Sequence, residues 1–264
     1  MWHSWPAEGA SELNAAIDQY QEIHPGVRIA MVPLPEDVLI DEFIRAGKDG
    51  LGPGLLIASN RSIAELVDEG LLKPLAVGPT GADLLDPRNQ QLVAYDGQLY
   101  GVPLSLQKQA LYYNKRLVTD PPDSLDGLLQ EAVEGRQVAF VPRFTDAYWG
   151  IQAFGAGLFD DEGHFTLAES GFTEWLLWLD EAQGAPGVIL NIDQVSLQEL
   201  FAAEQIAYYV GGPDQQKLIA DMIDEEDPFE FGVVSLPEGP HGPAGPLLSA
   251  DTVLHYSHTS AQQA

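Results

Sequence analysis

The sequence contains no cysteine and very little positive charge, and each shortage excludes a class of protein. Its 264 residues include 12 Lys and Arg against 40 Asp and Glu, which gives a formal net charge of −28 at pH 7. Without cysteine, disulfide scaffolds, thiol catalysis and thiolate-bound metals are impossible. Because phosphate backbones and anionic membranes are bound through clustered Lys and Arg, nucleic-acid partners are excluded and membrane surfaces are disfavoured.

Long apolar runs and the common catalytic motifs are missing as well. No apolar run approaches the roughly 20 residues of a membrane-spanning helix. The first six residues lack both the basic start and the apolar core of a signal peptide, so we expect either a cytosolic protein or one whose leader precedes this sequence. There is no Gly-x-Ser-x-Gly, no P-loop and no Gly-x-Gly-x-x-Gly. These absences leave no sequence signature of an enzyme.

The spacing of the histidines and acids predicts neither a metal site nor a catalytic set. Of the six histidines only His255 and His258 are close in sequence, and an i, i+3 pair in a strand points to opposite faces. We therefore expect no bound metal, no cofactor and no enzyme activity. A glycosidase stays open as a minor alternative, because two of the 40 acids could still face each other as a carboxylate pair.

The abundant residues predict a folded α/β protein. Hydrophobic residues make up 45% of the chain and aromatic residues 9%, which is enough apolar surface for sizeable cores. Ser11 is predicted to cap a first helix, and Gly70 to end a later one. Strands are expected over 27–32 and 55–58, with helices over 36–46 and 62–69. Alternating strands and helices are typical of an α/β layer with a mainly parallel sheet.

The rest of the chain continues the same pattern. Asp96-Gly97 predicts a hairpin turn between two short strands. The acidic run 224–227 is predicted to be a solvated loop, and the segment 238–246, with three Pro and three Gly, a surface loop. Further strands are predicted over 110–113, 207–210 and 231–234, and further helices over 124–135, 145–157, 171–182 and 196–203.

Several aromatic residues lie at predicted breaks, where loops line clefts. They are Trp5, Phe144, Tyr148, Trp149 and Phe154. Aromatic faces stack on sugars, whose hydroxyls are bound by carboxylates and amides. Interior packing is nevertheless the commonest role of aromatic residues, and Trp175 and Trp178, beside Leu176 and Leu179, are predicted to be core. Ligand stacking and packing therefore both stay open for the aromatics at breaks.

Nine short motifs occur in a characteristic order along almost the whole chain. They are Trp-His-Ser-Trp (2–5), His-Pro-Gly-Val (24–27), Gly-Pro-Gly-Leu-Leu (52–56), Glu-Gly-Leu-Leu-Lys-Pro-Leu (69–75), Tyr-Asp-Gly-Gln-Leu-Tyr-Gly-Val-Pro (95–103), Leu-Tyr-Tyr-Asn-Lys (111–115) with Pro-Pro (121–122), Phe-Gly-Ala-Gly-Leu-Phe (154–159), Gly-Gly-Pro (211–213) and Phe-Gly-Val-Val-Ser-Leu-Pro (231–237). With this order the chain resembles the extracellular solute-binding proteins of ABC importers, in the family typified by the maltose-binding protein.

The resemblance implies a two-lobed, type II periplasmic-binding-protein-like α/β fold. The lobes would be residues 1–106 and 107–244, with 245–264 returning to the first lobe as a crossing strand. A solute would be held between the lobes, whose hinge closure is read by permease subunits in the membrane. Members usually have a leader and several further C-terminal helices, so the resemblance predicts a C-terminally shortened chain. It also implies an extracellular or periplasmic protein, with lipid anchoring through a leader as one route.

The resemblance also points to ligand contacts, position by position. Gln107 stands where maltose-type members have an acidic contact, and Asp214 replaces the tryptophan of their Gly-Pro-Trp signature. Losing that stacking wall argues against maltose itself and leaves another sugar, a polyol, or a cationic or peptide-like solute open. The predicted contacts are Trp5, Glu8, Asn60, Arg61, Gln107, Phe144, Tyr148, Trp149 and Asp214.

Two functions from different classes follow. The leading one is a non-catalytic substrate-binding protein of an importer that binds a carbohydrate-like solute. The alternative is an interaction or sensor module that keeps the fold without transport, which the altered contact positions and the shortened end favour. A solute that stabilises the folded chain would separate the two.

Overall fold

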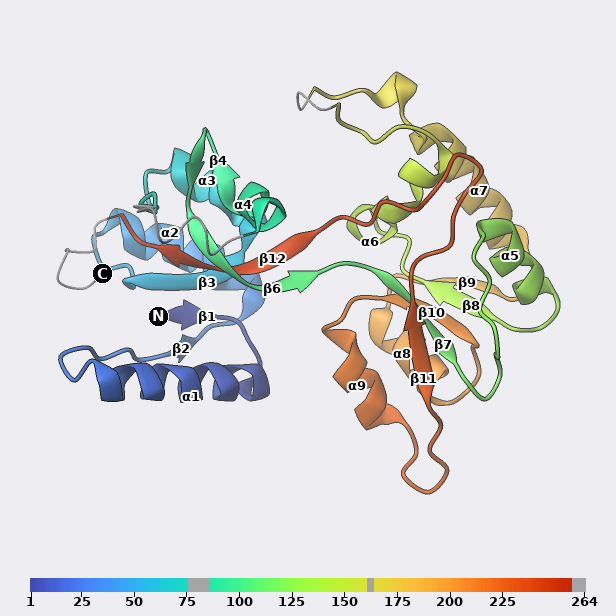
Figure 1. Cartoon of the computed structure of the whole chain (residues 1–264), viewed down its shortest axis with the longest axis horizontal. Helices are drawn as coiled ribbons and strands as arrows, with labels where there is room; N and C mark the ends of the chain where they lie inside the picture. Colours follow the sequence, from blue (N-terminus) through green and yellow to red (C-terminus); the bar gives the residue numbers. More distant parts are fainter. Residues whose placement is uncertain (76–85, 161–163, 258–264) are drawn as a thin grey trace. The chain divides into compact units, whose positions relative to one another are not determined.

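The computed structural model describes residues 1–75, 86–160 and 164–257, apart from the side chain of Glu8. The chain divides into two compact units (Figure 1). Unit 1 comprises Met1–Leu106 with Leu248–Ala264, and unit 2 comprises Gln107–Leu247. Each unit has its own sheet, and each is described by itself below.

Unit 1 is built on a five-stranded sheet in the order β2-β1-β3-β12-β6. Its strands are β1 (Trp2–His3), β2 (Val32–Pro33), β3 (Leu55–Ser59), β6 (Gly101–Gln107) and β12 (Ser249–His255). Strand β1 runs parallel to β2 and β3, and β12 runs antiparallel to β3. The helices are α1 (Ala7–Ile23), α2 (Glu36–Lys48), α3 (Ile63–Asp68) and α4 (Pro87–Val93).

Local sequence signals explain several elements of unit 1. Helix α2 buries Leu39 and Phe43, one turn apart, against the sheet. Gly70 has a positive φ of 72°, and its N–H bonds to the carbonyl of Val67 while that of Leu71 bonds to Leu66, which is a Schellman end for α3. The predicted hairpin is present as β4 (Ala94–Tyr95) and β5 (Gln98–Leu99), with Asp96 and Gly97 both at positive φ.

Two predictions for unit 1 are wrong. Helix α1 begins at Ala7, directly after Pro6, and Ser11 lies inside it rather than at its cap. The strand predicted over 27–32 shrinks to β2, the outermost strand of the sheet, at Val32–Pro33. A proline cannot donate a ladder hydrogen bond, so an edge strand is the position that tolerates it. Strand β12 contains His255, whereas His258 lies outside the described residues.

Unit 2 has a five-stranded sheet in the order β11-β7-β10-β8-β9. Strand β8 (Val138–Phe140) runs parallel to β9 (Val188–Leu190) and β10 (Tyr208–Gly211), and β7 (Ala110–Asn114) runs antiparallel to β10 and β11 (Phe231–Val234). The helices are α5 (Leu125–Val133), α6 (Phe144–Ala147), α7 (Phe172–Gly184), α8 (Gln194–Ala202) and α9 (Gln215–Met222).

The helix predicted over 145–157 is wrong in unit 2. The segment forms the short helix α6 and two 3-10 turns, Tyr148–Gly150 and Gln152–Phe154. A Cβ at Gly150 would lie 2.3 Å from the Trp175 ring, so the core requires glycine here, and glycine is a poor helix former. Trp175 is core, as predicted, and stacks on Trp178, whereas Leu176 is 48% exposed and not part of the core.

Candidate functional site

In open α/β sheets, ligands bind beyond the carboxyl ends of the parallel strands. In unit 1 this edge holds the residues that follow β1 and β3, together with the start of antiparallel β12. Asp251 of β12 pairs in register with Ser59, the last residue of β3. The equivalent edge of unit 2 holds the residues that follow β8 and β10, together with the start of β7, where Ala110 pairs with Gly211.

At the unit 1 edge, one carboxylate holds two side chains. Oδ2 of Asp251 accepts hydrogen bonds from Nε1 of Trp5, at 3.1 Å, and from Oγ of Ser105, at 3.0 Å. The backbone N–H of Trp5 also donates to Nδ1 of His3 at 3.1 Å. Burial lowers the pKa of His3, aided by the positive chain terminus, so the imidazole is neutral at pH 7 and its Nδ1 can accept. Trp5 is therefore held through both its backbone N–H and its indole N–H.

The other predicted contacts of unit 1 differ in their surroundings. Both ends of the Asn60 amide bond to the main chain, with Nδ2 donating to Leu92 and Oδ1 accepting from Ala250, each at 2.9 Å. Asn60 thus ties α4 and β12 to the end of β3. Arg61 is exposed. Glu8 lies in α1, and its side chain is outside the described part of the structure.

At the unit 2 edge, Gln107 and Asp214 come together around Gly212. A Cβ added to Gly212 would lie 2.5 Å from Oδ1 of Asp214 and 3.8 Å from Oε1 of Gln107. Glycine leaves room for both side chains at this point. The hydroxyl of Tyr112 donates to the Gly212 carbonyl at 2.7 Å and holds the loop that follows β10.

Two buried tyrosines donate hydrogen bonds to this loop and to the helix that follows it. Burial, and then the Asp214 carboxylate, raise the pKa of Tyr112 to about 12, so the hydroxyl stays protonated and donates at physiological pH. Tyr209 donates to Oε1 of the buried Gln215. Burial raises the pKa of Tyr209 as well, and the nearby carboxylates of Asp214 and Asp146 add to that effect. Both acids therefore lie close enough to Tyr209 to act on it.

The segment that follows β8 is organised by Asp146. Its Oδ2 accepts from Nε of Arg143 at 2.9 Å, and its Oδ1 accepts from Nε2 of Gln109 at 3.4 Å. A further donor of Arg143 reaches Oε1 of Gln194 at 3.4 Å. The Asp146 carboxylate thus connects the start of β7 to the segment that carries the predicted aromatic contacts.

The three aromatics of this segment take different positions. Phe144 is 56% exposed and makes an edge contact with the half-buried Tyr148, at 5.7 Å between ring centroids. Trp149 is only 1% exposed and packs at 4.8 Å from Trp175 in the core of unit 2. Its Nε1 makes no hydrogen bond to any described residue. Phe144 and Tyr148 offer ring surface at the edge, whereas Trp149 is a packing residue of the unit.

Two buried acceptors at this edge are unsatisfied. Oε1 of Gln107 and Oε1 of Gln109 are both inaccessible to solvent and accept no hydrogen bond from any residue that the structure describes. Such atoms are rare in folded proteins, because an unpaired buried acceptor is destabilising. The two oxygens can accept from a group that donates hydrogen bonds, in the same unit that presents the exposed ring of Phe144.

The sequence analysis missed Gln109 and Asp251. Gln109 follows Gln107 by two residues, and residues two apart on an extended segment share a face, so its position was open to prediction. Asp251 lies 246 residues from its partner Trp5, and no local pattern connects the two.

Comparison with known proteins decides the family. The model of the bacterial extracellular solute-binding proteins matches residues 15–264. The chain belongs to this family. A putative binding protein of Brucella abortus is 23% identical over 272 residues, which cover 92% of this chain and 64% of that protein. A maltotriose-binding protein of Pyrococcus abyssi is 28% identical over 174 residues, 61% of this chain and 37% of the relative. The solute-binding chain described here thus spans less than two thirds of these relatives.

Solved structures share the fold of this solute-binding protein. A cyclo/maltodextrin-binding protein in complex with maltotetraose matches 99% of this chain and 70% of its own length, with a TM-score of 0.81 at 21% identity. The GacH receptor of Streptomyces glaucescens matches 99% and 72%, with a TM-score of 0.83 at 20% identity. The fold is therefore the two-lobed α/β fold of the maltose-binding type. None of the described helices is long and apolar enough to cross a membrane.

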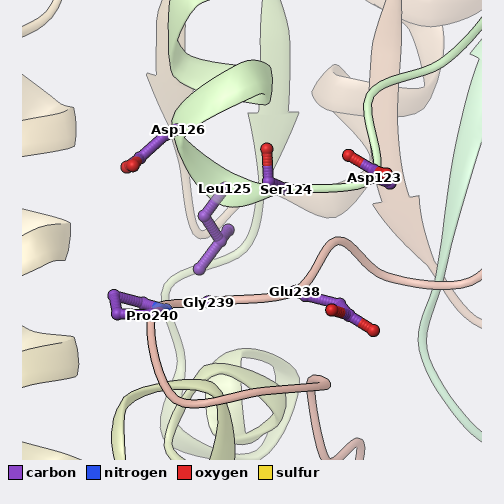
Figure 2. Close-up of a pocket in the computed structure, with 7 residues that line it drawn as sticks. All are labelled: Asp123, Ser124, Leu125, Asp126, Glu238, Gly239 and Pro240. Carbon is purple, nitrogen blue, oxygen red and sulfur yellow. The ribbon is translucent and has the colours of Figure 1, made fainter.

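A pocket of about 230 Å³ in unit 2 lies beside the start of α5 (Figure 2). Its lining includes the carboxylates of Asp123, Asp126 and Glu238. In Figure 2 Asp126 lies at the left of the view, and Asp123 and Glu238 lie at the right. Across the described residues, no group of three His, Asp or Glu side chains could hold a metal ion. The pocket is therefore no candidate metal centre of this solute-binding protein.

Proposed function

We propose that the chain is a non-catalytic solute-binding component of an ABC-type importer, and that it binds a carbohydrate-like solute. The observation that carries the proposal is the pair of unsatisfied acceptors at the unit 2 edge, Oε1 of Gln107 and Oε1 of Gln109, in the unit that also presents the exposed ring of Phe144. Sugar hydroxyls donate hydrogen bonds, and the C–H face of a sugar packs on an aromatic ring.

The predicted contacts take different roles in this proposal. Phe144 and Tyr148 supply ring surface, and Gln107 and Asp214 accept from hydroxyls. Trp5, fixed by Asp251 and His3, offers a ring at the unit 1 edge. Arg61 and Glu8 remain candidate polar contacts, while Asn60 and Trp149 act by holding the main chain and the core around the site.

The names of the relatives support a carbohydrate. They include the maltotriose-binding protein already described, a galactooligosaccharide-binding protein and a maltodextrin-binding protein of Bacillus subtilis, and a maltooligosaccharide ABC transporter solute-binding lipoprotein of Streptococcus pneumoniae. By the same kinship we propose an extracellular or periplasmic location and permease subunits in the membrane as partners. We include lipid anchoring in the proposal because one relative is named a lipoprotein.

Thermal unfolding against a solute panel tests the proposal. The panel would hold maltotriose, maltotetraose, galacto-oligosaccharides, polyols, polyamines and short peptides. A solute that binds only the folded chain raises the midpoint, by about 2.7 kcal/mol of stabilisation at a hundred times its Kd. We expect a selective, concentration-dependent shift with one class of oligosaccharide. A cooperative transition that no carbohydrate moves would contradict the proposal.

One observation favours the interaction module as a second candidate. Strand β6 lies at the edge of the unit 1 sheet, and its residues Val102, Leu104 and Leu106 are each at least 40% exposed. An edge strand with a row of exposed apolar side chains is a common site of protein association. In that case no solute would shift the midpoint, and light scattering would show association that substitution of Leu104 by Lys abolishes.

A further inference from the structure

The amide of Gln109 has one paired end and one unpaired end: its nitrogen donates to Asp146, and its oxygen is buried without a described donor. We propose that Gln109 is a specificity-determining residue of the solute site: the Asp146 carboxylate fixes its amide so that Oε1 accepts a hydrogen bond from a hydroxyl of the solute. This inference rests on the proposed function and names the atom that selects the solute.

The carboxylate determines which way the amide points. Nε2 of Gln109 donates to Oδ1 of Asp146 at 3.4 Å. An ionised carboxylate has only acceptors, so a flipped amide would set Oε1 against another acceptor and lose this bond. Arg143 donates to the other oxygen of Asp146 at 2.9 Å, which holds the carboxylate in place. The amide therefore has one favourable orientation, with Oε1 directed away from Asp146.

In that orientation Oε1 of Gln109 is buried and has no donor among the described residues. Gln107, two residues earlier, leaves its own Oε1 in the same condition. An empty buried acceptor destabilises the free protein, and a partner that donates to it recovers the lost hydrogen bond on binding. Two such acceptors select a solute with two donor groups and reject an isostere that lacks them.

The charges nearby exclude one class of solute. Asp146 bonds to Gln109 at 3.4 Å, and Asp214 lies with Gln107 beside Gly212, so each amide has a carboxylate near it. The Arg143 guanidinium is engaged by Asp146 and Gln194. An anionic solute would meet acceptors and negative charge here, whereas a neutral, hydroxyl-rich solute would meet partners for its donors.

A double-mutant cycle tests the proposal. The variants are Gln109→Met, which keeps the size and removes both the Oε1 acceptor and the Nε2 donor to Asp146, Asp146→Asn, which frees the amide to rotate, and their combination. Gln183→Met, at an exposed position of α7, is the matched control. Binding is measured by calorimetry with maltotriose, maltotetraose and a galacto-oligosaccharide, and the midpoint of thermal unfolding is measured without sugar.

We expect Gln109→Met to weaken binding of the sugar that the wild type binds by about ten- to a hundredfold, the usual effect of losing a buried hydrogen-bond partner. Asp146→Asn should weaken binding in the wild-type background and have no further effect beside Gln109→Met, because its influence runs through the amide. Without sugar, Gln109→Met should unfold close to the wild-type temperature, because it loses the long bond to Asp146 but also removes an unpaired buried acceptor. Gln183→Met should change neither quantity.

Each contrary result has a distinct meaning. If the wild type binds a sugar and Gln109→Met binds it equally well, the role of Gln109 is overturned while the proposed function stands. If Asp146→Asn weakens binding equally in both backgrounds, Asp146 does not position Gln109 and the proposal fails. A larger loss of stability in sugar-free Gln109→Met than in Asp146→Asn, which disrupts the same bond, would show that Oε1 already has a partner, and that also overturns the proposal. If the wild type binds none of the three sugars, the proposed function fails first and takes this inference with it.

Discussion

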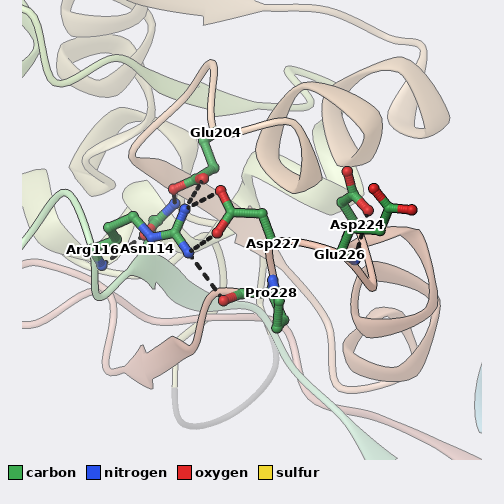
Figure 3. Close-up of polar contacts among 7 residues, drawn as sticks. All are labelled: Asn114, Arg116, Glu204, Asp224, Glu226, Asp227 and Pro228. Carbon is green, nitrogen blue, oxygen red and sulfur yellow. Dashed lines mark hydrogen bonds and ion pairs between the residues drawn. The ribbon is translucent and has the colours of Figure 1, made fainter.

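The two edges of the unit 2 sheet differ in whether their polar side chains have hydrogen-bond partners. At the carboxyl edge, the amide oxygens of Gln107 and Gln109 are buried without donors among the described residues. At the amino edge, the Arg116 guanidinium donates to both oxygens of Asp227 at 3.1 Å, to Glu204 at 2.6 Å and to the carbonyl of Pro228 at 3.0 Å (Figure 3).

The polar side chains that meet around Arg116 at the amino edge are paired with one another. Asn114 is fully buried, and its amide donates to Glu204 while its oxygen accepts from the backbone of Arg116. Residues 224–227 form an exposed loop, as predicted, and Asp227 also joins an ion-pair cluster with Arg116. Figure 3 shows Asp224 and Glu226 apart from the cluster. The contrast accords with the proposed function, in which the carboxyl edge contacts the solute while the amino edge stabilises the unit.

The largest effect is expected on stability, when the paired side chains of the amino edge lose Glu204. Glu204 has a positive φ of 56°, a conformation that is unfavourable for a residue with a side chain and is kept here by its bonds to Arg116 and Asn114. We expect Glu204→Ala to lower the free energy of unfolding by about 2–4 kcal/mol, because it leaves a buried amide unpaired and keeps the strained backbone. Chemical denaturation measures the change.

Glu204→Gly is the matched control for that prediction. It removes the same bonds but relieves the positive φ, so it should be less destabilising than Glu204→Ala by about 1 kcal/mol. Sugar affinity should be unchanged in both variants at temperatures where they are folded. Equal stabilities for the two variants would show that the backbone at Glu204 is not strained.

The next effect is on binding at the unsatisfied edge. Tyr148→Ala removes ring surface beside Phe144 and should weaken sugar binding at least about tenfold if the ring stacks on the solute. Tyr148→Phe keeps the ring and should bind within a few-fold of the wild type. Calorimetric titration with maltotriose or the preferred oligosaccharide measures both. Unchanged affinity in Tyr148→Ala would remove the residue from the site.

Much of the fold could be predicted from local signals, since helices and turns are determined by neighbouring residues. Helix α2 and the hairpin at Asp96-Gly97 are examples, and the motif order led to the family. The site was harder to predict. The break near Phe144 could be seen in the sequence, but which ring faces inward depends on Trp175, 26 residues beyond Trp149. The ties of Asn60 to Leu92 and Ala250 likewise depend on contacts between distant segments.

A smaller effect, of opposite sign, sharpens the comparison between the edges. Gln107→Met removes a buried acceptor that has no described donor, so the free energy of unfolding of the sugar-free protein should rise by about 1 kcal/mol. Gln216→Met, at an exposed position of α9, should stay within about 0.5 kcal/mol of the wild type. Urea unfolding measures both. A clear loss of stability in Gln107→Met would remove the distinction between a satisfied and an unsatisfied edge.

The smallest effect concerns pH and extends the comparison to unit 1. Nε2 of His255 in β12 is buried without a hydrogen-bond partner among the described residues, and burial, together with the nearby Lys73, lowers the pKa of His255 in the folded chain. The unfolded chain then binds the proton more readily, at the ordinary pKa of about 6.5. The stabilisation from a neutral His255 is complete above that pH and is lost as the pH falls below it towards the lowered pKa. We expect His255→Phe to reduce the decline in unfolding free energy between pH 7.5 and 5.5. His3 has a lowered pKa as well, so part of the decline should remain, and an unchanged pH profile in His255→Phe would show that His255 does not contribute to it.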